Sequence, residues 1–197
     1  MGEITRSKNI KFIYNNLIVK CAHPPVVKFS KWEDDLHSNI EGWKKYFCIL
    51  QKGCRDTHLY NFQYKFLHRT IPTNTFLYKI KIKDTKLCSF CRCEDETIGH
   101  LFYDCQVTSN FLYLFCACLK NFYVNIEFNK KNFFLGFVEE SLFLNFLVIF
   151  AKKYIYKCKL EEKLPNAIEL RNRLKNFYNL ELYTARKYNK VFELEKL

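Results

Sequence analysis

Hydrophobic residues recur at steps of three and four along most of this chain, which is the spacing of helices that each bury one face. One such apolar stripe runs from Trp32 to Leu50. Ser-x-x-Glu capping boxes begin at Ser30 and at Ser38, so we expect two short helices or one kinked helix here. The next stripe predicts a helix over 57–69, which ends before Pro72 because the residue ahead of a proline is pushed out of the α region.

The second half of the chain also has the helical pattern. A helix is expected over 110–122, followed by a long helix that Ser141 caps and that runs to about residue 162. Pro165 is well placed as the first residue of a last helix, which would run toward residue 195. Residues 79–83 alternate Lys and Ile with a period of two and could form a short strand or an extended lead into the segment that follows, and 123–128 is the only other strand candidate.

A polar segment between these helices carries four residues of the types that bind zinc: Cys88, Cys91, His100 and Cys105. Zn²⁺ prefers four thiolate or imidazole ligands in a tetrahedron, and a two-residue gap lets two cysteine sulfurs converge on one ion. The residues between the two pairs are too polar to be ordered by burial alone, so a metal ion would give them a reason to fold. Cys93 could replace Cys91 as a ligand, although the two-residue turn favours Cys91. The sequence therefore predicts a structural zinc site.

Together these patterns predict a mainly α fold, in which a helical domain carries a small zinc-stapled knuckle insert over 88–105 and at most one or two short strands. We expect an N-terminal lead-in over 1–29, a helical region with the zinc-binding module over 30–122, and a C-terminal helical segment over 123–197.

The composition bears on the compartment and on the remaining cysteines. Ten cysteines would fit a disulfide framework in a secreted protein, but charged and amide residues interrupt 1–20, which does not resemble a secretory leader. We therefore expect an intracellular protein, nuclear or cytoplasmic, and no membrane partner, since the longest apolar run reaches about half of a bilayer span. Cys116 and Cys118 are expected in the core. Cys48, Cys54 and His58 lack a fourth partner for a second metal site.

Lys and Arg outnumber Asp and Glu by 32 to 20, and the net charge of +12 favours a polyanionic partner, RNA or DNA. We expect the contacts around the zinc segment, with Phe90 exposed enough to stack on a base. The candidate nucleic-acid-binding residues are Arg69, Lys79, Lys81, Lys83, Lys86, Phe90 and Arg92. A competing basic set, which a solvated helical face would equally explain, is Lys152, Lys153, Lys157, Lys159, Arg171, Arg173 and Lys175.

The same residues carry a resemblance to a known family. The run 59–74 and the block from Cys88 to Cys105, with its Glu96-Thr97-x-x-His100 core, are similar to the reverse-transcriptase zinc-binding region at the C-terminal end of LINE-type non-LTR retrotransposon polyproteins. Flanking segments near 31–36 and 151–157 also resemble that family, so the resemblance extends over nearly the whole chain.

The resemblance implies a module that follows the polymerase in the polyprotein and helps to hold template RNA or target DNA during target-primed reverse transcription. Zn²⁺ would be its cofactor, and it would have no active site and no small-molecule substrate of its own. A polymerase palm needs an aromatic-x-Asp-Asp hairpin to bind metal ions. The nearest string here, 32–35, lies at the expected start of a helix, where Asp34 and Asp35 would interact with the helix dipole. No aspartate follows Asp104, which excludes the restriction-like nuclease site of some relatives.

Two functions from different classes remain open on the sequence. The first is a zinc-containing nucleic-acid-binding fragment of a retrotransposon reverse transcriptase. The second is a zinc-stabilised helical module that docks onto a protein partner, such as the polymerase domain. Steep loss of nucleic-acid affinity with salt would support the first, and no binding at low salt would support the second.

Overall fold

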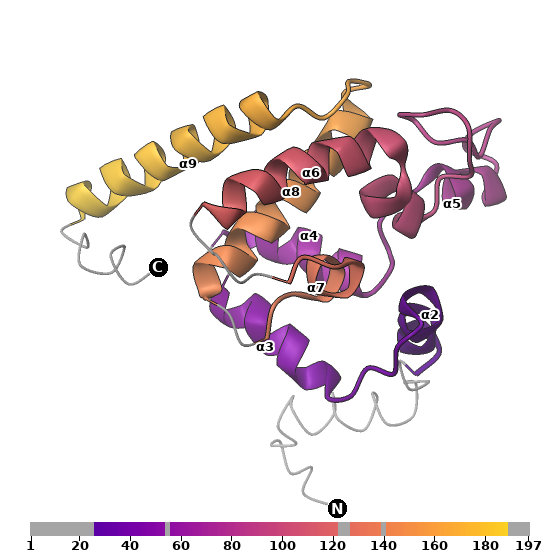
Figure 1. Cartoon of the computed structure of the whole chain (residues 1–197), viewed down its shortest axis with the longest axis horizontal. Helices are drawn as coiled ribbons and strands as arrows, with labels where there is room; N and C mark the ends of the chain where they lie inside the picture. The colour runs from indigo at the N-terminus through magenta and orange to yellow at the C-terminus, as the bar shows by residue number, and fades with distance from the viewer. Residues whose placement is uncertain (1–25, 54–55, 122–126, 139–140, 189–197) are drawn as a thin grey trace, which may run out of the picture. The chain divides into compact units, whose positions relative to one another are not determined.

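The computed structural model describes residues 26–53, 56–121, 127–138 and 141–188 (Figure 1). The chain divides into two compact units, Met1–Asn39 and Ile40–Leu197. The described part of the first unit is helix α2 (Val26–Leu36) and the residues that follow it. The boundaries expected at residues 30 and 123 stay a prediction.

Helix α2 corrects two details expected from the sequence. Ser30 lies inside the helix rather than at its start, so the capping box assigned there is wrong. Asp34 and Asp35 are exposed in the last turn, where acidic groups do not gain from the helix dipole. The helix ends at Leu36, and the next residue, His37, has a φ of 47°. Trp32 is fully buried, so the side chain that opens the predicted stripe is a core residue.

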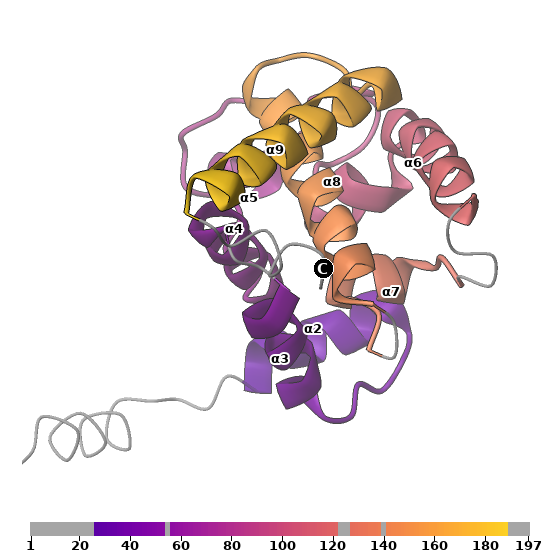
Figure 2. The ribbon, with the colours of Figure 1, turned by 90° about the vertical axis from the view of Figure 1, so that its left-hand side faces the viewer.

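The second unit is built around α8 (Leu142–Leu160), which packs against α3 (Trp43–Gly53), α4 (Thr57–Leu67) and the π-helical turn η1 (His100–Asp104) (Figures 1 and 2). Buried residues cover a wide face of α8, from Leu144 to Lys159, as in a helix that packs against several neighbours. Ser141 caps it by accepting a hydrogen bond from the Leu144 N–H (3.1 Å). The long capped helix predicted from the sequence is therefore confirmed.

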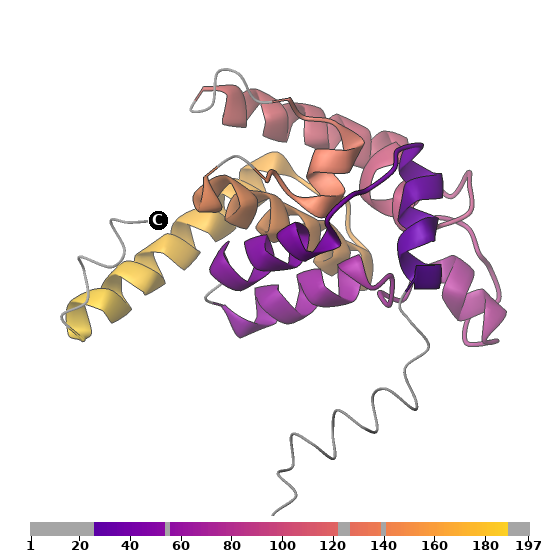
Figure 3. The same cartoon turned by 90° about the horizontal axis from the view of Figure 1, so that it is seen from below.

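Helices α3 and α4 form one side of this unit, and both contact α8 (Figure 3). The helix expected over 57–69 is α4, with Leu59, Phe62, Phe66 and Leu67 buried as the apolar pattern predicts. The second capping box is wrong, because α3 begins at Trp43 rather than beside Ser38. The single stripe from 32 to 50 therefore spans two helices separated by a loop.

Aromatic rings join these helices to the zinc segment. The Phe66 ring of α4 meets the Phe102 ring of η1 edge to face, with centroids 5.0 Å apart, and it meets Phe134 of α7 (Lys130–Leu135) in the same way at 5.5 Å. All three side chains are fully buried. Such pairs add about 0.5–1.5 kcal/mol each beyond the burial of their area. The knuckle is therefore anchored on the helical core.

A tight chain reversal after α7 depends on one glycine. Gly136 has a φ of 110°, and a Cβ atom added there would lie 2.9 Å from Asn145 Oδ1. That oxygen accepts the N–H of Phe137 (2.8 Å), and the Asn145 amide group donates to the Phe137 carbonyl (2.8 Å). The buried Asn145 side chain thus satisfies backbone groups where the chain approaches α8.

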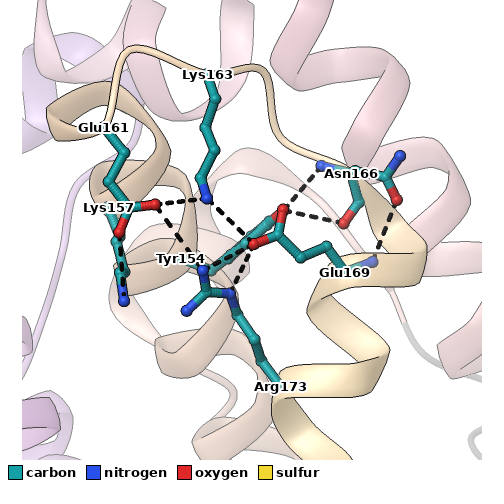
Figure 4. A network of polar contacts seen from close by, with 7 residues as sticks. All are labelled: Tyr154, Lys157, Glu161, Lys163, Asn166, Glu169 and Arg173. Atoms are coloured by element: carbon teal, nitrogen blue, oxygen red, sulfur yellow. Dashed lines mark hydrogen bonds and ion pairs between the residues drawn. The ribbon is translucent and has the colours of Figure 1, made fainter.

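Helix α6 (Gln106–Lys120) packs on η1 and on α9 (Ala167–Lys187). Asn166 caps α9, so Pro165 precedes the cap and is not the first helical residue as expected. Figure 4 shows the polar network around this start: the Tyr154 hydroxyl lies 3.0 Å from Glu169 Oε2, and Arg173 donates twice to Glu169 Oε1 (2.9 and 2.7 Å). The network fixes the first turns of α9 against α8.

The described residues contain no strand, only an isolated antiparallel bridge between Leu87 and Asp95. The strand expected over 79–83 is wrong: Lys79 ends α5 (Asn74–Lys79), and the N–H groups that follow bond back to that helix. Of the other candidate, 123–126 lie outside the described residues. The mainly helical fold with a small Cys/His insert is confirmed. Among the described helices, none combines the length and the apolarity needed to cross a bilayer.

Candidate metal centre

Two local turns present the four candidate ligands. In the first, the Arg92 N–H donates to the Cys88 carbonyl (3.0 Å), Arg92 adopts a φ of 58°, and the Phe90 N–H points at the Cys88 sulfur (3.4 Å). In the second, Thr97 Oγ1 accepts the His100 N–H (3.0 Å). The wide π-helical turn then closes with the Cys105 N–H on the His100 carbonyl (2.8 Å).

The turns bring the ligand atoms of Cys88, Cys91, His100 and Cys105 within 4.8 Å of one another. Two Zn–S bonds of about 2.3 Å at the tetrahedral angle would place their sulfurs about 3.8 Å apart. The sulfurs of Cys88 and Cys105 are 3.8 Å apart, and the Cys91 sulfur lies 3.2 Å from His100 Nε2. Three thiols and one imidazole at these separations form a donor set that fits a tetrahedral zinc ion.

The His100 ring is oriented for this role. Its Nε2 atom faces the sulfurs, and its Nδ1 atom lies 3.1 Å from Glu94 Oε2, though not aligned for a hydrogen bond with any described residue. Metal-binding histidines usually donate their second ring N–H to a carboxylate or a carbonyl. Glu94 is largely exposed and has room to reorient toward that nitrogen. His100 itself is buried, so its two nitrogens need partners at this site.

The thiols differ in their readiness to lose a proton. Burial raises the pKa of Cys88 to about 12, although N–H groups of Cys91 and Phe90 favour its thiolate. For Cys91, burial also acts to raise the pKa, but hydrogen bonds from the Cys93 and Glu94 backbone and the contact with His100 outweigh it and lower the pKa to about 6. A divalent cation would displace the proton that Cys88 otherwise keeps at neutral pH.

Glu96 organises the knuckle, although no role was assigned to its side chain from the sequence. It is fully buried, and its carboxylate accepts the Asn74 N–H at Oε1 (2.8 Å) and the Ser89 N–H at Oε2 (2.7 Å). Its own carbonyl accepts the hydroxyl of Thr75 (2.8 Å). One side chain thus ties the start of α5 to the turn that carries Cys88.

A buried ion pair connects this carboxylate to α8. Lys159 Nζ lies 2.7 Å from Glu96 Oε1 and donates to the Pro72 carbonyl (2.7 Å), with both charged side chains almost inaccessible to solvent. Burial lowers the pKa of Lys159, while the contact with Glu96 acts to raise it. Only two signals of this ion pair are present in the sequence, the Glu96-Thr97 motif and a lysine in an apolar helix, and they lie 63 positions apart.

A scan against protein-family models matches residues 36–111 to the family described as zinc-binding in reverse transcriptase. This segment is therefore similar to the zinc-binding region of reverse transcriptases. The match covers less than half of the chain and includes all four clustered residues. A search of curated proteins gave no match. The resemblance of the segments on either side stays a prediction.

Within the matched segment, the arrangement does not support the alternative that Cys93 replaces Cys91 as a ligand. Cys93 is exposed, and its sulfur contacts the Cys91 carbonyl (3.1 Å) rather than the cluster. Among the described residues, the four-residue cluster is the only group that could hold a metal ion. Cys54 lies outside the described residues. Cys118 is exposed and Cys116 partly so, so the expectation that both are core residues is wrong for Cys118.

The basic residues expected to bind nucleic acid have different surroundings. Lys79, Lys81, Lys83 and Arg92 are exposed, and Lys86 is paired with Asp95 at 2.7 Å. Arg69 is half-buried at a φ of 52°. The lysines at 79, 81 and 83 do not share one face of an extended segment, because Lys81 sits in the left-handed region (φ 59°) and the N–H of residue 82 bonds back to the Leu77 carbonyl.

Two expectations about individual side chains are wrong. Phe90, which lies between two cluster residues in the sequence, is only 9% exposed, so its ring is not free to stack on a base. In the competing basic set, Lys152 and Lys159 are buried. Lys152 Nζ donates to the Phe134 carbonyl (3.0 Å) and lies over the Phe66 ring at 4.7 Å. These two lysines are part of the core.

Proposed function

We propose that this chain is a non-catalytic, zinc-binding and nucleic-acid-binding fragment of a LINE-type retrotransposon reverse transcriptase, and that it positions template RNA or target DNA. The observation that carries the proposal is the Cys88, Cys91, His100 and Cys105 cluster inside a reverse-transcriptase zinc-binding region. These residues would hold one Zn²⁺, which cross-links the turn of Cys88 and Cys91 to the turn of His100 and Cys105.

The donor set supports a structural rather than a catalytic ion. Catalytic zinc sites keep one position open for water or substrate, whereas structural sites use four protein ligands. Four protein donors converge here, and Cys88, Cys105 and His100 are buried. The matched family is a zinc-binding accessory region rather than a catalytic one. We therefore infer that the chain neither extends primers nor cuts nucleic acid.

The charge distribution supports a polyanionic partner. The chain has a net charge of +12, and exposed lysines at 79, 81 and 83 lie in the segment that the knuckle clamps in place. Protein cations that neutralise phosphates release counterions, so the affinity falls steeply with salt. Positioning would follow because Glu96 links this segment to the metal-binding turn and Lys159 links both to the core.

The test is a binding titration of the zinc-loaded chain against single-stranded RNA, single-stranded DNA and duplex at several salt concentrations. Replacing Lys79, Lys81 and Lys83 together by Ala should weaken binding by about one to a few kcal/mol and flatten the salt slope by about one unit per lost phosphate contact. A matched control changes exposed cations of α9, Arg171 and Lys175, to Ala. Equal losses in the two variants would show that binding is spread over the surface.

One observation favours a second candidate, a protein-docking module. A hollow of about 400 Å³ between α6 and the start of α9 is lined mainly by apolar side chains, including Phe111, Leu114, Leu164 and Ile168, of which the last three are more than half exposed. Such surfaces often mark protein contacts. In that case zinc would stabilise a scaffold for a partner such as the polymerase domain. No detectable nucleic-acid binding at low salt would favour this function over the first.

A further inference from the structure

Exposed apolar side chains gather on one short part of the zinc-binding region. We define the basic arm as residues 74–83, which are α5 and the turn that follows it. Phe76 is 51% exposed, Tyr78 is 49% exposed and Ile82 is 68% exposed. A cluster of exposed large apolar side chains often marks a binding surface. The sequence led us to expect that Phe90 stacks on a base, but the structure buries Phe90 and exposes Phe76 and Tyr78.

The basic arm is fixed in shape despite its exposure. The Ile80 N–H donates to the Phe76 carbonyl (3.2 Å), and the Ile82 N–H to the Leu77 carbonyl (2.9 Å). At its base, the Asn74 side chain donates to the Leu87 carbonyl (2.7 Å), in addition to the bond from its N–H to Glu96. Rings on a prefixed backbone lose little conformational entropy when a ligand covers them.

Cations alternate with these apolar groups. Lys79, Lys81 and Lys83 are exposed in the same ten residues, and Asp84 just beyond is the nearest acidic residue in the sequence. An apolar protein surface would have to desolvate three ammonium groups in order to cover the rings. A strand of nucleic acid would meet both features at once, with phosphates on the lysines and bases on the rings.

We propose that the basic arm is a stacking site for unpaired bases, with Phe76 and Tyr78 as the stacking rings and the three lysines as phosphate contacts. The ligand class is single-stranded nucleic acid, because bases in a duplex do not expose their faces. Successive residues of a helix are about 100° apart, so positions 76 and 78 lie on different sides of α5 and serve different bases. This inference rests on the proposed nucleic-acid function and deepens it.

The experiment compares binding of a short oligouridylate and of a duplex of equal length to zinc-loaded variants. Phe76→Ala and Tyr78→Ala should each weaken oligouridylate binding about five-fold or more, and the losses should multiply in the double variant, while duplex binding is unchanged. Phe76→Trp should retain affinity and Phe76→Leu should lose it, since only the ring stacks. Tyr113→Ala is the matched control, because Tyr113 is 76% exposed on α6, away from the basic arm in sequence.

A second readout does not depend on affinity. Tyr78→Trp adds an indole to the arm, and its fluorescence should be quenched by oligouridylate beyond the change that wild-type protein shows. Zinc content and circular dichroism of every variant should match the wild type, because both rings are half-exposed. Absence of extra quenching would overturn the role of Tyr78.

The outcomes separate the two proposals. If the ring variants bind nucleic acid as tightly as the wild type does, the stacking site is wrong and the proposed nucleic-acid function still stands. Equal losses on oligouridylate and duplex, or equal affinity of the Leu and Trp variants at position 76, overturn it as well. Ring-dependent binding of polyglutamate as tight as that of oligouridylate would make the basic arm an acidic-peptide surface. If the wild type binds no nucleic acid at low salt, the proposed function fails and this inference fails with it.

Discussion

The buried pair of Glu96 and Lys159 should be the most sensitive point of the zinc-binding region. The Glu96 carboxylate accepts from two backbone N–H groups and from Lys159, at 2.7–2.8 Å. A Glu96→Gln side chain has a single acceptor oxygen and sets an amide N–H₂ against one of those donors. It also removes the charge that compensates a buried ammonium group.

The magnitude follows from that loss. Breaking a buried ion pair by removing one partner costs about 3–5 kcal/mol, because the other charge stays uncompensated. We therefore expect Glu96→Gln and Lys159→Met each to lower the free energy of unfolding by about 3–5 kcal/mol. The double variant should lose less than the sum, with a coupling energy of about 2 kcal/mol or more. Urea unfolding of the zinc-loaded chain measures all four corners of this cycle.

The adjacent residue supplies a matched control. Asp95 pairs with Lys86 at the same 2.7 Å separation, but both side chains are about half exposed. Exposed pairs contribute about 0–1 kcal/mol, so Asp95→Asn should barely change the unfolding free energy. Should Glu96→Gln cost no more than Asp95→Asn, or should the double-mutant cycle be additive, then the burial and coupling argument is wrong.

Three further outcomes are expected. Cys105→Ser should abolish tight binding of one Zn²⁺ per chain, as measured by metal analysis, whereas Cys93→Ser should leave it intact; the reverse result would refute the ligand assignment. Burial raises the pKa of Cys88 to about 12, so zinc must displace its proton, and zinc affinity should rise about tenfold per pH unit for each proton released and fall on acidification. A competition titration at neutral and mildly acidic pH that showed constant affinity would contradict this. Gly136→Ala should destabilise the chain by about 1–3 kcal/mol in thermal or urea unfolding, because Gly136 has a φ of 110° and its Cβ would meet Asn145; a neutral effect would show that the loop relaxes freely.

Local spacing in the sequence determined the Cys/His cluster and the main helices. The pair Cys88 and Cys91 and the pair His100 and Cys105 each lie within one turn, so their geometry depends on nearby backbone, and the sequence alone predicted that they converge. The same holds for α8, whose apolar run and Ser141 cap are contiguous in the chain. Hydrophobic periodicity and helix capping depend on residues that are close in the sequence, so they can be predicted without knowledge of the tertiary structure.

Only the tertiary structure decided which cations and rings are available to a partner. Lys159 looks like a surface lysine in the sequence, but long-range packing brings it to Glu96, and Phe90 is covered although its neighbours are polar. The alternating lysines at 79–83 have the pattern of a strand, but the N–H groups of this segment donate to carbonyls of α5. No neighbouring strand is present among the described residues to pair with them. Burial and pairing depend on segments distant in sequence, which a periodic pattern does not encode.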